Sequence, residues 1–129
     1  MPRHVTTYDP NRAPNAESWL ALDESERIEL TLRYHRHVQV RLPNARMHAV
    51  IHCVVETQIA MRDETPVREV MQRLQAEGLD RHEAIHAVGS VLAKRIYDLM
   101  KEGAPTGDPN ETYRAELNEL SAEVWKHAR

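Results

Sequence analysis

The chain contains a single cysteine, Cys53, among its 129 residues. One cysteine excludes a disulfide framework and a cysteine-rich zinc module, and it is typical of a reducing compartment. A basic surplus is also lacking, since 17 lysine and arginine residues against 20 aspartate and glutamate residues give a net charge of -3. The chain therefore has no basic surplus to neutralise phosphates, and we expect no nucleic-acid partner. Because no apolar run reaches about 18 residues and no apolar stretch follows the N-terminal Met-Pro-Arg-His, we expect no membrane contact and a cytoplasmic protein.

Strand signals are scarce, whereas helix signals recur along the chain. Only residues 38–42 alternate apolar and polar side chains, and this stretch ends at Pro43 with no partner segment. Capping residues, capping boxes and glycine stops instead predict helices. The expected helices cover residues 23–42, 45–62, 66–77, 81–102 and 109–127, and a short one covers 15–21.

The N-terminal residues form a separate segment in this interpretation. Residues 1–14 hold three of the 7 prolines and show no apolar periodicity, which indicates an irregular arm that can lie over the domain. The sequence therefore predicts an all-α, compact bundle of about five helices as one domain over residues 15–129, with the arm before it.

The helix expected over residues 45–62 is apolar around nearly its whole circumference. Between Met47 and Met61 its only formally charged side chain is Glu56. Such a helix belongs in the middle of a bundle, covered by its neighbours. It nevertheless carries His48, His52 and Glu56 at spacing i, i+4 and i+8, on one slowly drifting stripe. Burying these groups without partners would cost roughly several kcal/mol, so something must satisfy them.

Residues 82–86 read His-Glu-Ala-Ile-His, an HExxH pattern at the start of the helix expected over 81–102. His82 and His86 lie one turn apart and can converge on one ion, while Glu83 is placed to act on a metal-bound water. Gly89 and Ala93 beside them would let another helix approach closely, and the 45–62 helix is the natural occupant. The helix dipole also favours the neutral, metal-binding form of His82 in the first turn.

These two groups predict a site for a divalent metal, with zinc as the default in the absence of thiolates. Five donors exceed one tetrahedral site, so either Glu56 orients a ligating histidine or two metals share the pocket. If the site is catalytic, the expected reaction is hydrolysis of a small molecule, with Glu83 as the base. A di-iron site is disfavoured because only one Glu-x-x-His pair exists, and a protease because no sheet presents a peptide. The candidate metal ligands are His48, His52, Glu56, His82 and His86.

Each candidate also has a purely structural interpretation. Glu83 occupies the capping-box position opposite Asp80. The histidines of the 45–62 helix would be hydrogen-bonded core residues, and those of the HExxH pattern would be partly exposed polar residues. Cys53 is expected to be a small buried hydrophobe.

The remaining histidines are expected to be bystanders. His35 falls near one face of its helix with Ile28 and Leu32, but it lies two residues from His37 and a solvated surface position is favoured for both. His4 and His127 lie near the ends of the sequence.

The stretch from Met47 to Met100, with the segments MHAVIH, ETQIAM, PVREVM and GLDRHEAIHAVGSVLAK, resembles a group of small bacterial proteins of unknown function. The resemblance covers a little under half of the chain. It implies a bacterial protein and adds no mechanism.

Two hypotheses follow from the sequence. In the first, a helical protein holds a metal between the 45–62 and 81–102 helices and acts on a small-molecule substrate. In the second, the chain is a non-catalytic protein-interaction module with structural histidines, which contacts partners through its arm or its acidic last helix. A homodimer fits either, because five helices cover the apolar central one thinly.

Overall fold

The computed structural model describes residues 5–37, 45–103 and 107–128, and within these ranges every regular element is helical. The prediction of an all-α bundle is therefore confirmed. The alternating segment 38–42 lies outside the described residues. Among the described residues, none of the helices is both long enough and apolar enough to cross a membrane. The elements are α1 (Ala16–Ala21), α2 (Glu24–His37), α3 (Ala45–Ala60), the 3-10 helix η1 (Arg62–Glu64), α4 (Val67–Ala76), α5 (Arg81–Glu102), α6 (Pro109–Glu119) and α7 (Ala122–Ala128).

Side chains cap backbone N–H groups at the starts of α1, α2, α5, α6 and α7. Asp23 accepts a hydrogen bond from the backbone N–H of Glu26 at 2.8 Å, and the Glu26 carboxylate accepts one from the N–H of Asp23 at 3.3 Å. This confirms the predicted capping box. The single last helix expected over 109–127 was wrong, because α6 ends at Glu119 and α7 begins at Ala122. Ser121 caps the new start by accepting a hydrogen bond from the N–H of Val124 at 3.0 Å.

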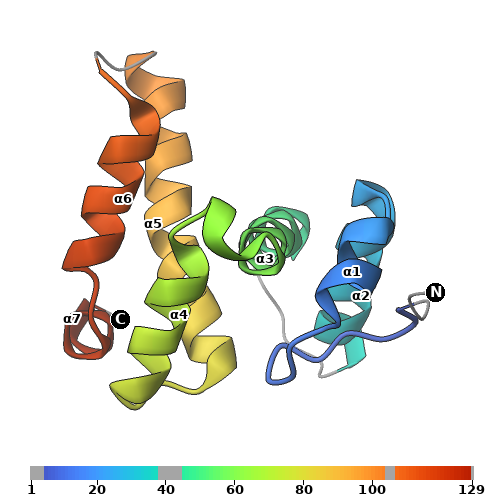
Figure 1. Cartoon of the computed structure of the whole chain (residues 1–129). Coiled ribbons are helices and arrows are strands. Elements are labelled where there is room, and N and C mark those ends of the chain that lie inside the picture. The colour runs from blue at the N-terminus through green and yellow to red at the C-terminus, as the bar shows by residue number, and fades with distance from the viewer. Residues whose placement is uncertain (1–4, 38–44, 104–106, 129) are drawn as a thin grey trace.

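Helix α3 lies at the centre of the molecule, as its all-round apolar surface predicts. Figure 1 shows it nearly end-on, with α1 and α2 on one side and α4 to α7 on the other. It contributes Val55 to a core cluster shared with α4, α5 and α6, and Ala49, Cys53 and Ala60 to a second cluster around α1 and α2. Helix α3 therefore buries surface in two cores, and among its polar residues His52 and Glu56 are each only 1% exposed.

The contact between α3 and α5 is close, and Gly89 is the reason. A Cβ atom added at Gly89 would lie 2.9 Å from Cγ2 of Ile51 on α3, which is shorter than a van der Waals contact between carbon atoms. The predicted close approach of the two helices at this seam is confirmed. It brings the histidines of α3 within reach of those of α5.

Candidate metal centre

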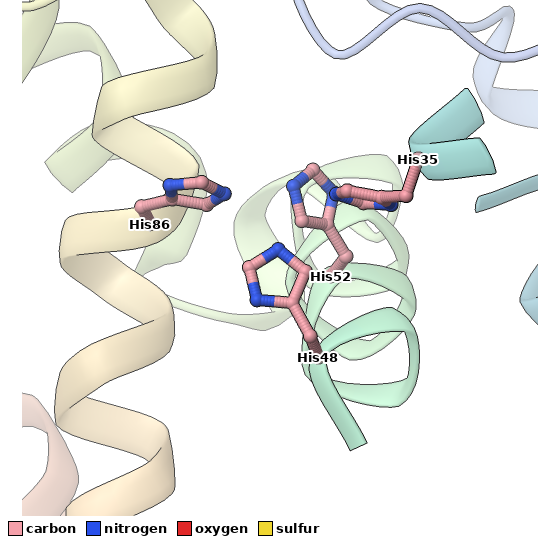
Figure 2. A group of neighbouring side chains, drawn as sticks. All are labelled: His35, His48, His52 and His86. Atoms are coloured by element: carbon pink, nitrogen blue, oxygen red, sulfur yellow. The ribbon is translucent and has the colours of Figure 1, made fainter. Parts of the chain in front are cut away.

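Four histidines from three helices meet where α2, α3 and α5 pack together. His35 comes from α2, His48 and His52 from α3, and His86 from α5, and each offers one ring nitrogen that lies within 4.8 Å of the other three. Figure 2 shows the rings of His35 and His86 approaching those of the α3 pair from the sides of their own helices. The i, i+4 spacing places His48 and His52 one above the other on α3. These four residues can together hold a metal ion.

A fifth imidazole, from His82, borders this group. Its ring centroid lies 4.3 Å from that of His86 and 5.2 Å from that of His52. The four-residue spacing of His82 and His86 on α5 places both rings on the side that faces α3. We call the set His35, His48, His52, His82 and His86 the histidine cluster.

The Nε2 atoms of the whole histidine cluster are buried and have no hydrogen-bond partner among the residues that the structure describes. Leaving one buried polar group unsatisfied costs about 1–3 kcal/mol, and buried polar groups in proteins are nearly always paired. Five such nitrogens in one place therefore indicate a group that the described residues do not supply. An electron-pair acceptor that several nitrogens can share is the simplest such group.

The hydrogen bond of His35 determines which of its nitrogens is free. Its Nδ1 lies 2.8 Å from the carbonyl oxygen of Thr31, one turn earlier on α2. A carbonyl can only accept, so Nδ1 carries the proton and donates it. Nε2 then carries a lone pair, and this is the form of a histidine that binds a metal.

His52 is held in the same form by a chain of two hydrogen bonds. The Tyr8 hydroxyl donates to Oε2 of Glu56 at 2.5 Å and lies 2.9 Å from Nδ1 of His52. Because its one proton goes to the carboxylate, the hydroxyl oxygen can only accept from Nδ1–H of His52. The Nε2 lone pair of His52 is therefore left to the histidine cluster. Burial, followed by the adjacent Glu56 charge, raises the pKa of Tyr8 well above its usual range, so the phenol keeps its proton.

Glu56 is paired in the interior with Arg81. The two guanidinium nitrogens Nη1 and Nη2 donate to Oε2 and Oε1 of Glu56, both at 2.7 Å, in a bidentate pair. Nη1 also donates to the carbonyl oxygen of Pro10 at 2.9 Å. Only 1% of Glu56 is exposed, so its charge is balanced by Arg81 and not by solvent.

Burial also lowers the pKa of the four cluster histidines on α3 and α5. It lowers the pKa of His48 and His86 to about 4, and neighbouring imidazoles add to the effect. Burial is also the main cause that lowers the pKa values of His52 and His82. At neutral pH these rings are therefore unprotonated and can act as ligands without first losing a proton.

The candidates named from the sequence occupy different places around this centre. His48, His52 and His86 belong to the group of four, and His82 lies beside it. The carboxylate of Glu56 is directed to Arg81 and reaches His52 only through Tyr8. Glu83 donates its backbone N–H to Asp80 at 2.7 Å, and its role as a base stays a prediction.

Sequence reasoning missed three residues of the site. The expectation that His35 is a surface residue was wrong, since only 5% of it is exposed. Its place on the apolar face of its helix, near Ile28, was the signal that could have found it. Tyr8 and Arg81 carried no comparable signal, because their partner Glu56 is distant in the sequence. Cys53 is buried as predicted, and burial raises its pKa to about 11.

A cavity of about 390 Å³ adjoins the histidine cluster between α3, α5 and α7. Its size falls in the range of about 300–1,000 Å³ that is usual for small-molecule pockets. The residues that line it are Met47, His48, Ile51, His52, Ile85, His86, Gly89, Ser90, Ala93 and Trp125.

Comparison of the chain with protein-family models, with curated proteins and with solved structures found no match. The site is therefore interpreted from its own geometry. That geometry consists of neutral imidazoles with unsatisfied nitrogens, a buried hydrogen-bonded support behind one of them, and a cavity along one side.

Proposed function

We propose that this protein binds a divalent transition-metal ion in the histidine cluster, with zinc as the default metal. The observation that carries the proposal is the burial of five Nε2 atoms without partners in one place. His35, His48, His52 and His86 are the ligands that we assign first, because their nitrogens lie within 4.8 Å of one another. Binding of a metal by these nitrogens would satisfy them together.

The chemistry of the donors supports a transition metal over calcium or magnesium. Those two ions prefer carboxylate, carbonyl and water oxygens, and the buried carboxylate of Glu56 is engaged by Arg81 and Tyr8. Imidazole nitrogens suit zinc, copper, nickel and iron. The Nδ1–H bonds of His35 and His52 support the same assignment, because ligating histidines usually donate their second nitrogen to a fixed acceptor.

The adjoining cavity supports a catalytic role, the hydrolysis of a small molecule. A metal at this position can lower the pKa of a bound water and polarise a carbonyl group. His48, His52 and His86 contribute both to the cluster and to the cavity wall, so a molecule in the cavity would lie next to the ion. In this proposal Glu83 remains the candidate base, and its test is the activity of the Glu83→Gln variant.

Elemental analysis of tag-free protein tests metal binding. We expect about one bound metal ion per chain in the wild type and a loss of most of it in His52→Ala and in His86→Gln. The control variant is His127→Ala, because His127 is exposed and its Nδ1 bonds the Glu123 carbonyl in its own helix. Wild-type protein without metal, even after incubation with zinc, would refute the proposal.

Thermal unfolding with and without a chelator separates this proposal from a non-catalytic interaction module. A metal that binds only the folded chain adds stability that a chelator removes. We therefore expect a lower Tm with chelator for the wild type and no change for His52→Ala. An unchanged wild-type Tm would favour structural histidines.

A further inference from the structure

The cavity beside the histidine cluster has one polar wall and otherwise apolar walls. Three of its lining residues, His48, His52 and His86, are cluster members, whereas His35 and His82 are not among the lining residues. The cluster therefore faces the cavity through three rings. A molecule in the cavity would lie next to these rings.

The rest of the wall is suited to an apolar body. Apart from the histidines, it consists of the side chains or backbone of Met47, Ile51, Ile85, Gly89, Ser90, Ala93 and Trp125. None of these residues is charged. The Trp125 indole N–H is buried without a partner among the described residues, so an acceptor on a ligand would satisfy it.

The charge balance of the site favours an anion. Neutral imidazole ligands leave the double positive charge of a metal ion uncompensated, and an unbalanced charge away from water is costly. Glu56 does not balance it, because its charge is paired with Arg81 at 2.7 Å. Asp9 and Asp80, whose carboxylates act on His82, are exposed and screened by solvent. Glu83, the candidate base, is not among the residues that line the cavity.

From this charge balance and this wall we infer that the cavity binds a small carboxylate with an apolar body. Its carboxylate would bind the metal, and its body would lie against Met47, Ile51 and Ile85. The inference rests on the proposed metal site, since the anion is held by the ion. The inference adds the chemical class of the ligand, which is a carboxylic acid with one negative charge and an otherwise apolar body.

Cobalt-substituted protein provides a direct measurement, because the visible spectrum of Co²⁺ changes when a ligand binds to it. Benzoate, acetate and benzamide are titrated against this protein. Acetate has the same charged group without the body, and benzamide has the same body without the charge. We expect benzoate to change the spectrum and to bind about tenfold or more tightly than acetate, because it buries more apolar surface. We expect no spectral change with benzamide.

Filling the cavity tests the location. The test variant is Ala93→Phe, because Ala93 lines the cavity and is exposed at its rim. The control is Ala115→Phe, which places the same side chain at an exposed position of α6. We expect Ala93→Phe to keep the Co²⁺ spectrum and lose the preference for benzoate over acetate, and Ala115→Phe to keep both.

The two proposals fail differently in this experiment. Failure of Co²⁺ to bind refutes the metal site and the ligand inference with it. Bound Co²⁺ whose spectrum does not respond to benzoate, or responds equally to benzamide, refutes the ligand inference alone. Equal affinities for acetate and benzoate, or an unchanged preference in Ala93→Phe, likewise refute binding of the body in this cavity.

Discussion

The hydroxyl oxygen of Tyr8 lies 2.9 Å from Nδ1 of His52, and the two residues are 44 positions apart in the chain. This contact joins the N-terminal segment to the central helix. Glu56 accepts a hydrogen bond from the Tyr8 hydroxyl, and Arg81 balances the charge of Glu56. The segment before α1 therefore contributes Tyr8 to the candidate metal centre, where it orients His52 and is not itself a proposed ligand.

Removal of the Tyr8 hydroxyl is expected to weaken metal binding. In Tyr8→Phe, Nδ1–H of His52 loses its acceptor and the ring loses its fixed orientation. Loss of such a supporting partner usually lowers metal affinity by about 10–100-fold. Competition with a chromophoric chelator measures this change. Tyr97→Phe is the control, because Tyr97 is 62% exposed, and an equal loss in both variants would contradict the proposed support.

The pair of Arg81 and Glu56 is expected to be essential for stability. Arg81→Met leaves a buried carboxylate without its partner, which should lower the free energy of unfolding by about 3–5 kcal/mol. Urea denaturation followed by circular dichroism measures it. Arg36→Met, which breaks an exposed pair with Glu29, should change the free energy of unfolding little. A double variant Arg81→Met/Glu56→Met should recover part of the loss, and no recovery would argue against an uncompensated charge as the cause.

The close contact at Gly89 predicts that even an alanine at this position lowers the stability of the folded protein. Gly89→Ala raises helix propensity by about 1 kcal/mol but forces a methyl group against Cγ2 of Ile51. Overpacking costs about 1–3 kcal/mol, so we expect a lower free energy of unfolding and weaker metal binding as α3 and α5 separate. When Gly89→Ala and Ile51→Ala are combined, their effects on the free energy of unfolding should be non-additive, because the two side chains meet at this contact. Strict additivity in a double-mutant cycle would contradict the contact.

Stability of the metal-free protein is expected to fall as the pH is lowered. The pKa values of His48 and His86 are about 4 in the folded protein, whereas histidines in the unfolded chain titrate near about 6.5. Between these values the unfolded chain binds more protons, so the free energy of unfolding decreases from pH about 6.5 to about 4. Urea denaturation across this range, in the presence of a chelator, measures the slope. A double variant His48→Gln/His86→Gln should show a smaller slope, and His127→Ala an unchanged one.

The helices and the two histidine pairs were predictable from sequence because the signals are local. The Asp23–Glu26 capping box and the spacing of His48 with His52 each span about one turn, and the periodicity of a helix places such residues on one face. The apolar surface of the 45–62 segment also predicted its central position. The division of the last helix at Ser121 was missed, because a single capping serine is a weak signal inside a long helical pattern.

Sequence alone determined which segments form helices and which side chains share a face, since both follow from neighbours a few residues away. Tertiary structure decided which faces meet. His35 joins the histidine cluster because α2 packs on α3, and Glu56 is excluded from it because Arg81, 25 residues later, pairs with its carboxylate. These contacts arise from the burial of apolar surface between distant segments, which has no fixed spacing along the chain.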